Sequence, residues 1–346
     1  MHHNHIPPRR GDFQGAFHMK IAFTSCFDAS QDPTQEVWLD MLGHQPDVLL
    51  LLGDSIYMDF WPHLGRPRTL SDAQFAEEMY SRYRRQWGVA SFRTLIRAVA
   101  HVGIIWDDHD FAWNGACGTS RKEKCDWNDE LLIWQCTPTV DEQPYIDVVS
   151  DTKKRIAHAL FSQFKQVLRT TGHADTYPDM PLLADMLAMP AHSITEVFNI
   201  GEVRIILLDT RSFREPMIDP YSPGLLLGAA QQQWLLAQSQ HSGISLICSG
   251  TALTRGSESW DKYRDYQWLM EQPLGKAVVL SGDIHKNAQK LHKYGSNRLL
   301  EITSSGAAQP GLGGDCGNFG LIETDGQHFQ AWLCSEGHPP QSVNCA

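Results

Sequence analysis

The sequence predicts an α/β fold, and three observations support this prediction. Short aliphatic runs that end in Gly, Asp or Ser alternate with longer stretches of helical periodicity. The runs are apolar on consecutive residues, as expected of strands that are buried on both faces of a sheet. Of the 346 residues, 42% are hydrophobic and 20% are charged, which supplies enough apolar material for one large core or two modest ones and excludes a disordered or collagen-like chain.

The aliphatic runs and the turns beside them predict the strands. Residues 197–205 carry a Gly-Glu pair between two β-rich pieces, which predicts a hairpin that leads into residues 206–209. Residues 298–303 and 317–333 extend the β content near the C-terminus. The other predicted strands are residues 21–24, 47–52, 102–106, 244–248 and 277–280.

The clearest helix signal begins at Ser71. The sequence Ser71-x-x-Gln74 fits a capping box, and apolar side chains then recur every fourth residue from Phe75 to Trp87. We expect this apolar stripe to pack in the core. The other predicted helices are residues 91–100, 152–169 and 229–240.

One domain over residues 20–346 is the simplest interpretation, because no repeat, low-complexity tract or Gly/Ser linker interrupts it. Residues 111–193 are poor in strand signals and rich in Trp, Pro, Asp and Cys, so we expect a helical and loop insertion near the active face. Residues 1–19 are expected to be an expression leader, with a native histidine-rich metal-binding tail as the alternative.

Charge and hydropathy argue against several classes of partner. With 29 Lys+Arg against 40 Asp+Glu the formal net charge is -11, so no stable nucleic-acid complex is expected. The longest aliphatic run, residues 48–52, is far shorter than the roughly 20 residues that a membrane span needs. No apolar segment of a secretory signal precedes residue 20, so we expect a cytoplasmic protein. The oligomeric state stays open.

Residue types that bind metals follow four of the predicted strands. Sites of α/β sheets lie beyond the carboxyl ends of the strands, so these residues are expected to converge. A lone Asp after a strand is more often a turn or cap residue, but four strand ends of this kind favour a site. The residues are Cys26 after the first strand, Asp54 and Tyr57 after the second, residues 107–110 after the third, and Asp283 and His285 after residues 277–280.

The segment from Asp107 to Asp110 is the strongest of these signals. It places three carboxylates and one imidazole on consecutive residues, where mutual repulsion is costly unless cations or hydrogen bonds offset it. A solvated acidic loop is the alternative.

The types of ligand favour two different cations. The Cys26 thiolate and the Tyr57 phenolate suit a redox-capable metal such as ferric iron, whereas carboxylates alone suit Mn, Mg or Ca. Asp54 is the natural bridge, since it lies three residues before Tyr57 and a carboxylate has two oxygens to share.

These motifs resemble a known family. They are Ser25-Cys26, Gly53-Asp54-Ser55-Ile56-Tyr57, Trp106-Asp107-Asp108-His109-Asp110, Leu208-Asp209-Thr210-Arg211-Ser212-Phe213-Arg214 and Ser281-Gly282-Asp283-Ile284-His285. In this order they are similar to the motif set of the alkaline phosphatase D (PhoD-like) branch of the calcineurin-like metallophosphoesterases. The resemblance runs from about residue 21 to the C-terminal strands.

The resemblance implies a four-layer α/β/β/α sandwich, with two mixed sheets flanked by helices and a dinuclear site between the sheets. It implies that the first metal, expected to be ferric iron, is held by Cys26, Asp54, Tyr57 and His285, with Asp54 bridging. Asp108 and Asp283 would belong to the second metal, a divalent ion such as Ca, Mn, Mg or Zn.

The sequence departs from the broader superfamily in three places. Cys26 stands where many relatives have aspartate, Asp108 stands where they have asparagine, and residues 247–251 lack the histidine that usually completes the second site. The third protein ligand of the second metal therefore stays open, with Asn114 and Asp28 as candidates.

A binuclear site of this kind hydrolyses phosphate esters. Two cations about 3.5 to 4 Å apart clamp a phosphoryl oxygen, lower the pKa of a bridging water and stabilise the charge of an in-line displacement. His109 is predicted to protonate the departing alkoxide or to hold the substrate oxygen, with Asp107 or Asp110 as its orienting partner.

Three further residues are candidates for substrate contact. Arg211 could bind a phosphate oxygen, although a structural pair with Asp209 is the favoured alternative. Trp260 could line the mouth of the site, although packing is the more frequent role of such an aromatic residue. Asn114 could contribute a neutral oxygen.

We therefore predict a metal-dependent hydrolase of a small phosphomonoester or phosphodiester, with the choice between the two left open. The alternative is a catalytically weak or inactive iron-binding sensor on the same fold, since the usual second-metal histidine is missing. A cofactor-binding oxidoreductase ranks well below both, because no Gly-x-Gly-x-x-Gly fingerprint follows the first strand.

Overall fold

The computed structural model describes most of the chain. The described residues are 19–59, 67–120, 123–128, 133–138, 148–170, 174–217, 223–310 and 316–344, with the backbone alone for 123–128 and 133–138. The predicted leader therefore lies outside the described residues apart from Met19, which is the first residue of strand β1.

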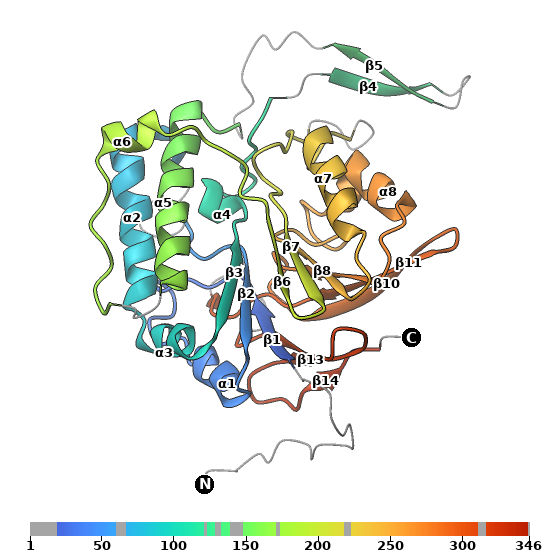
Figure 1. Cartoon of the computed structure of the whole chain (residues 1–346). Coiled ribbons are helices and arrows are strands. Elements are labelled where there is room, and N and C mark those ends of the chain that lie inside the picture. Colours follow the sequence, from blue (N-terminus) through green and yellow to red (C-terminus); the bar gives the residue numbers. More distant parts are fainter. Residues whose placement is uncertain are drawn as a thin grey trace.

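Two six-stranded mixed sheets form the centre of the molecule (Figure 1). The first sheet has the strand order β14-β13-β12-β1-β2-β3, in which β1, β2 and β3 run parallel and β12 is antiparallel to β1. Its strands are β1 (Met19–Thr24), β2 (Val48–Leu52), β3 (His101–Ile105), β12 (Phe319–Thr324), β13 (Phe329–Cys334) and β14 (Gln341–Ser342).

The second sheet has the order β10-β11-β9-β8-β7-β6. Strands β7, β8, β9 and β11 run parallel, and the edge strands β6 and β10 are antiparallel to their neighbours. The strands are β6 (Glu196–Ile200), β7 (Val203–Leu207), β8 (Ser245–Ser249), β9 (Ala277–Ser281), β10 (Ala288–Tyr294) and β11 (Asn297–Thr303). A separate hairpin pairs β4 (Glu123–Asn128) with β5 (Ile133–Pro138).

Helices cover the outer faces of the two sheets (Figure 1). On one side lie α1 (Val37–Gly43), α2 (Asp72–Gly88), α3 (Ala90–Ala98), α5 (Asp151–Arg169) and α6 (Leu183–Ala188). On the other side lie α7 (Ala229–Ser239) and α8 (Arg264–Glu271). The short elements are α4 (Asp108–Phe111), η1 (Pro67–Thr69) and η2 (Trp260–Lys262). The architecture is therefore the expected four-layer α/β/β/α sandwich.

Side-chain alternation in the second sheet explains how the layers pack. Val278 and Leu280 of β9 point into the main core between the sheets, whereas Val279 points into a second core beneath α7 and α8. All five residues of β2 are fully buried in the main core, as the continuous apolar run predicts for a strand covered on both faces. The metal-ligand candidates that follow β2 and β9 thus stand on rigid, fully packed strands.

The predicted elements that guided the functional analysis are confirmed, with ends shifted by a few residues. Helix α2 begins after Ser71, whose Oγ accepts a hydrogen bond from the Gln74 backbone N–H at 3.3 Å in the expected capping box. The hairpin after residue 196 forms as β6 and β7. The sequence did not predict the β4–β5 hairpin inside residues 111–193, because neither strand shows an uninterrupted apolar run. Helices α1 and α8 were also missed, since both are short.

No helix in the described part of the chain is long and apolar enough to cross a bilayer.

The close pairing of β1 with β12 generates a test of the packing. Gly320 lies directly opposite Phe23 in the register, and a Cβ atom at this glycine would overlap the fully buried Phe23 ring. We expect Gly320→Ala to lower the free energy of unfolding by about 1 to 3 kcal/mol, because the ring has no space to move in a close-packed core. Urea denaturation monitored by circular dichroism measures the loss.

Gly88→Ala at the end of α2 is the matched control, because an added methyl group there meets no described atom within 4 Å. It is expected to leave stability unchanged or slightly raised. Equal unfolding midpoints for the two variants would contradict the packing of β1 against β12.

Candidate metal centre

The candidate site lies where the carboxyl ends of the parallel strands of both sheets meet. Cys26 follows β1, Asp54 and Tyr57 follow β2, and α4 carries the acidic segment directly after β3. From the second sheet, Asp283 and His285 follow β9. The sandwich thus brings together residues that are up to 259 positions apart, as the strand-end argument predicts.

Left-handed backbone turns aim four of these side chains. Cys26, Asp54, Asp283 and His285 have φ values of 60°, 52°, 76° and 52°. This conformation is uncommon outside glycine, and residues held in it at functional sites are kept there by their surroundings. Each strand therefore ends in a sharp reversal that turns the side chain back toward the gap between the sheets.

Glycines provide the space for these reversals. A Cβ atom at Gly53, whose φ is 96°, would lie 2.7 Å from the Cβ of Asp107, and one at Gly250 would lie 2.8 Å from the Asp107 carboxyl group. Gly282 approaches Ser25 in the same way. Any side chain at these three positions would displace the strand ends, so the glycines set how closely the loops approach.

The four predicted ligands of the first metal lie next to one another. The Sγ of Cys26 donates to the Asp54 Oδ2 at 3.4 Å and also forms a hydrogen bond with Tyr57. The Tyr57 hydroxyl lies 3.2 Å from the Nε2 of His285. The contacts therefore link the four side chains in a row, from Asp54 through Cys26 and Tyr57 to His285.

Ser305, which was not among the predicted site residues, connects Cys26 and His285. Its Oγ donates to the Cys26 Sγ at 3.1 Å and accepts the His285 backbone N–H at 2.9 Å. Ser305 follows strand β11, so the strand-end criterion could have found it, but only thiol, phenol, imidazole and carboxyl groups were considered. It holds the thiol and the histidine loop in position.

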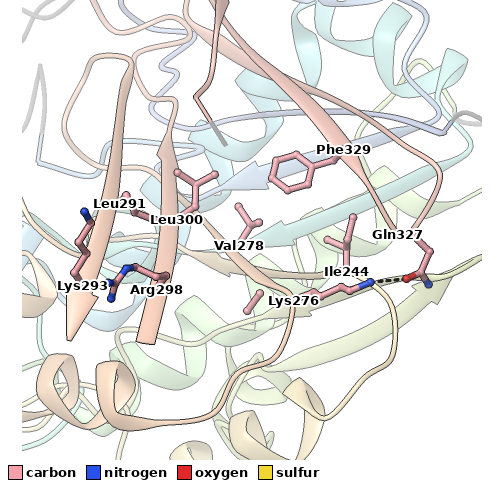
Figure 2. Close-up of a pocket in the computed structure, with 10 residues that line it drawn as sticks. Ile244, Lys276, Val278, Leu291, Lys293, Arg298, Leu300, Gln327 and Phe329 are labelled. Carbon is pink, nitrogen blue, oxygen red and sulfur yellow. Dashed lines mark hydrogen bonds between the residues drawn. The ribbon is translucent and has the colours of Figure 1, made fainter. Parts of the chain in front are cut away.

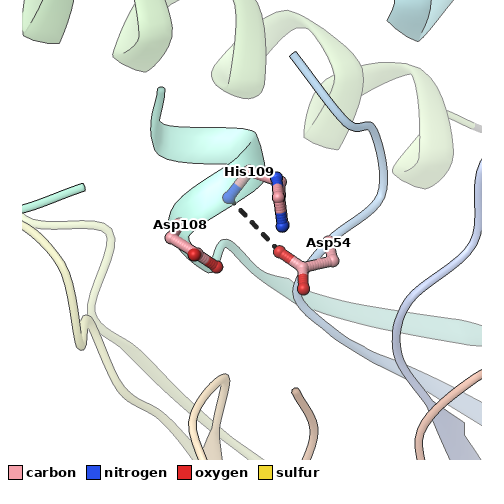
Figure 3. A group of neighbouring side chains, drawn as sticks. All are labelled: Asp54, Asp108 and His109. Atoms are coloured by element: carbon pink, nitrogen blue, oxygen red, sulfur yellow. Dashed lines mark hydrogen bonds between the residues drawn. The ribbon is translucent and has the colours of Figure 1, made fainter. Parts of the chain in front are cut away.

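The carboxylates form two groups that share Asp54. In one, shown in Figure 3, ligand atoms of Asp54, Asp108 and His109 all lie within 4.8 Å of one another. In the other, Asp54 lies within the same distance of Asp107 and Asp283. Asp107 was predicted among the converging strand-end residues and as a partner of His109, but not as a metal ligand, so its place in a group with Asp54 and Asp283 adds to the predicted ligand set.

His109 has a different partner from the predicted ones. Its Nδ1 forms a 2.6 Å hydrogen bond with the Oδ1 of Asp59, so the expectation of Asp107 or Asp110 was wrong. Asp110 instead accepts the Ser55 backbone N–H at 3.0 Å, and Asp107 caps α4. Asp110 also accepts the Asp107 backbone N–H, and Asp107 is bound by Arg211, so both carboxylates are engaged elsewhere and the imidazole is left to Asp59.

Asp59 also connects the candidate Asn114 to the site. The Asn114 backbone N–H donates to the Asp59 Oδ2 at 2.9 Å, and its side chain is exposed at the rim. Asp28, the other candidate, accepts from the Ser30 backbone N–H, and its Oδ2 is buried without a hydrogen-bond partner among the described residues. The role of third ligand to the second metal therefore stays a prediction for both Asn114 and Asp28.

A buried arginine balances the acidic charges. Arg211 is fully buried, and its Nε donates to the Asp107 Oδ1 at 2.6 Å while its Nη1 donates to the Glu258 Oε2 at 2.6 Å. Its Nη2 lies 3.4 Å from the Asp108 Oδ1 and donates to Thr251 at 3.2 Å. The favoured alternative, a pair with Asp209, was also wrong, because Asp209 accepts the backbone N–H of Arg211 and the guanidinium binds other acceptors.

Two of the three predicted substrate contacts are not supported by these positions. The Arg211 guanidinium is fully buried, and each of its three nitrogens already donates to a protein acceptor, so the group holds carboxylates and does not face an open site. Trp260 is fully buried in the second core, where its Nε1 donates to the Ser249 Oγ at 3.0 Å. Trp260 therefore packs in the core, which is the more frequent role of such an aromatic residue, and does not line the mouth of the site.

Glu258 extends this network to a second arginine. Its Oε2 accepts from Arg214 at 2.8 Å as well as from Arg211, and the two guanidinium groups hold the pKa of Glu258 below its usual value although burial alone would raise it. Glu258 lies in the loop between β8 and η2, in a stretch that resembles the PhoD-like family but for which no charge-balancing role was predicted.

The pKa values of the buried carboxyl groups indicate that a bound cation would stabilise the site. Burial and then the neighbouring Cys26 and Asp108 raise the pKa of Asp54 well above its usual value, and burial followed by Asp107 and Asp108 does the same for Asp283. Burial also raises the pKa of Asp110 to about 7. Carboxyl groups with such values release their protons when a cation binds, because metal ions and protons compete for the same oxygens.

The residues present fit bound metal ions. The Asp108 Oδ1 is buried and forms no hydrogen bond among the described residues, although the Arg211 Nη2 lies 3.4 Å from it and its Oδ2 accepts the Gly115 backbone N–H at 2.8 Å. A buried carboxylate oxygen without a partner is costly unless a cation or a further donor satisfies it. Together with the shared Asp54, this atom makes the cluster a plausible cation site on chemical grounds.

The role of Arg211 as a counter-charge can be tested by removing its charge. We expect Arg211→Met to lower the free energy of unfolding by about 3 to 5 kcal/mol, because it leaves buried carboxylates without a cation. Urea denaturation of protein freed of metals with a chelator measures the change. Arg97→Met is the control, since Arg97 pairs at the surface with Asp175, whose side chain is 80% exposed. A small effect at Arg211, matching that at Arg97, would refute the counter-charge role.

Comparison with known proteins agrees with this geometry. A family model described as PhoD-like phosphatase matches residues 21–318. A solved structure of PhoD has a TM-score of 0.59 at 15% identity, covering 95% of this chain and 72% of that chain, which supports the fold alone. No curated protein matches the sequence.

Two further solved structures have lower scores and carry no argument. A conserved uncharacterized protein of Streptococcus pneumoniae, described as a predicted phosphoesterase, has a TM-score of 0.32 at 10% identity, covering 95% of this chain and 100% of that chain. A protein of Thermus thermophilus has a TM-score of 0.41 at 9% identity, covering 91% and 98%. The family match and the acidic groups together support metal-dependent phosphoesterase activity, and the chain belongs to the PhoD-like phosphatase family.

Proposed function

We propose that the protein hydrolyses phosphate esters at a binuclear metal centre. The observation that carries this proposal is the position of Asp54, which belongs to both groups of three ligand residues. One carboxylate with two oxygens can serve two cations, and paired cations a few ångströms apart are the usual arrangement for in-line displacement at phosphorus.

The ligands divide by chemistry between the two positions. Cys26 contacts Asp54, and Tyr57 contacts both Cys26 and His285; a thiolate, a phenolate and an imidazole suit ferric iron. Asp108 and Asp283 supply the hard oxygens that suit a divalent ion such as Ca, Mn, Mg or Zn. The neighbouring Asp107 is held by Arg211, so it adds negative charge near the second position rather than an unshared oxygen.

The metal ions would supply Lewis acidity, which polarises the phosphoryl group and makes a bound water acidic. The protein positions the proton that the leaving group needs. Because Asp59 engages the Nδ1 of His109, the Nε2 is the nitrogen that can act on substrate. Burial lowers the pKa of His109, but the nearby Asp108, Asp54 and Asp59 outweigh it and raise the pKa well above the usual value, and Asp59 alone of the three is not assigned to a cation. His109 donates the proton to the departing oxygen.

Metal content and turnover test the proposal together. We expect protein purified without chelator to contain about one iron and one divalent ion per chain by plasma mass spectrometry, and to hydrolyse bis-nitrophenyl phosphate. A chelator is expected to abolish hydrolysis, and the divalent ion is expected to restore it. Paired mono- and bis-nitrophenyl esters then separate a monoesterase from a diesterase, since the metal ligands alone do not.

Colour identifies the metal beside Tyr57. Phenolate and thiolate ligands give ferric iron a visible charge-transfer absorption, so Tyr57→Phe should shift or abolish the tyrosinate part of the spectrum. A colourless protein that is replete in iron contradicts the ligand set. Iron alone, with no turnover under any metal, instead supports the sensor alternative.

The acid role of His109 predicts a dependence on the leaving group. We expect His109→Asn to slow hydrolysis of an alkyl phosphate ester by about 100-fold, because an alkoxide must be protonated as it leaves, and to slow a nitrophenyl ester much less. Steady-state kinetics on both esters measures the two effects.

Asp59→Asn serves as the comparison, since this residue acts on the reaction through the orientation of the His109 ring, and an asparagine keeps an oxygen that can accept the Asn114 backbone N–H. It is expected to give a smaller loss with the same preference between the esters. If His109→Asn slowed both esters equally and the protein lost bound metal, His109 would be a metal ligand and not the acid. Its place beside Asp54 and Asp108 permits this role too.

A further inference from the structure

A second cavity lies away from the candidate metal centre. Figure 2 shows this pocket, which has a volume of about 480 Å³ and lies between the two sheets. Small-molecule sites in proteins are typically about 300 to 1,000 Å³, so its size suits a compact organic ligand.

The pocket opens at the opposite end of the sandwich from the acidic residues. Ile244 and Lys276 line it, and they directly precede β8 and β9, whose other ends lead to Gly250 and Asp283. A strand rises about 3.3 Å per residue, so the five residues of β9 separate the two places by roughly 17 Å. No residue of the candidate metal centre lines the pocket.

The floor of the pocket is the edge of the main core, where Val278 and Leu300 are buried and Leu291 is half-buried. Leu300 of β11 pairs with Leu291 of β10 and with Val278 of β9, so the three side chains share the face that points between the sheets. Phe329 of β13 closes the pocket from the first sheet and is only partly buried. A ligand with an apolar body would remove this surface from water.

The rim of the pocket carries three cations. Lys293 and Arg298 are direct cross-strand partners, two positions beyond Leu291 and Leu300 on the same face. Like charges directly opposite each other in a sheet are destabilising. Lys276 is the third cation, and the ten lining residues include no carboxylate although the whole chain has a net charge of -11.

The rim cations have little negative charge to balance them. The Nζ of Lys276 donates to the neutral Gln327 Oε1 at 2.6 Å, and the Nη1 of Arg298 donates to backbone carbonyls of the adjacent turn. Lys293 has no ion pair among the described residues. The unbalanced charge sits directly beside the apolar floor, which complements a molecule that has one anionic and one apolar part.

We propose that this pocket binds a small amphipathic anion, with an apolar body on the Leu291–Leu300 floor and a carboxylate, sulfonate or phosphate head at the Lys293 and Arg298 rim. An inorganic anion would leave the floor exposed to water, and a neutral apolar molecule would leave the three cations unpaired. The proposal stands on the pocket alone and does not depend on the proposed hydrolytic function.

The probe for this site is 8-anilinonaphthalene-1-sulfonate, whose fluorescence rises in an apolar environment. We expect one saturable site per chain, and we expect Lys293→Glu with Arg298→Glu to weaken binding by about tenfold or more, because hydrogen bonds to charged groups are among the stronger polar contacts. The double variant Lys262→Glu with Arg85→Glu changes the net charge equally at exposed positions elsewhere, and it should bind as the unaltered protein does.

Two further measurements separate the parts of the proposal. N-phenyl-1-naphthylamine, which has the same rings without the sulfonate, is expected to bind about tenfold more weakly, and inorganic sulfate at the same concentration is expected not to compete. Protein stripped of metals by a chelator should bind the anionic probe as tightly as before. Equal binding by the two double variants, equal affinity for the neutral probe, or loss of binding on chelation would each overturn the proposal.

Discussion

Repulsion among buried carboxylates is the constraint that organises the carboxyl end of this sandwich. Asp54, Asp107 and Asp108 are almost completely buried within a few ångströms of one another, and Asp283 adds a fourth charge. Burial of isolated charges costs several kcal/mol per ion, so each must be neutralised, protonated or paired. Arg211 neutralises part of the cluster from the protein side. Burial, and after it the remaining negative charge, raises the pKa values of Asp54 and Asp283, so a cation that replaced their protons would relieve this repulsion.

Rigid strands and turns, rather than solvating water, hold the buried carboxylates in place. The strands that lead to the site are buried along their length, and the chain reverses within one or two residues at each of their ends. Left-handed backbone at a non-glycine residue costs on the order of 1 kcal/mol or more and persists only where the surroundings enforce it. Here the enforcing contacts include the Ser305 hydroxyl and the close approach of Gly53 to Asp107. A site built in this way is formed before a cation arrives, which lowers the cost of binding.

Strand ends made much of the site predictable from the sequence. Apolar runs such as residues 48–52 identify buried strands. A metal-binding residue directly after such a run lies at the carboxyl edge of the sheet, because parallel strands share that edge. The predicted neighbours Cys26, Tyr57 and His285 meet for this reason. Partners that lie off the strand ends were not predictable. Whether Asp59 or Asp110 orients His109 depends on which carboxylate the helix α4 backbone uses first, and this competition leaves no trace in the spacing of residues.

The two ends of the sandwich carry opposite charge, and their separation makes them electrostatically independent. Charges interact over about 8 to 10 Å at physiological ionic strength, and roughly 17 Å of strand β9 lies between Lys276 and the turn to Asp283. An anion at the basic rim therefore does little to the acidic cluster through charge alone. One end can therefore influence the other only if strand β9 moves. Val278 of β9 forms part of the floor of the pocket, and Ser281, the last residue of β9, is hydrogen-bonded to Glu301 and Thr303. Because β9 is fixed on both sides by parallel neighbours, such a displacement is small, and the amino-end pocket is best understood as a site with its own ligand.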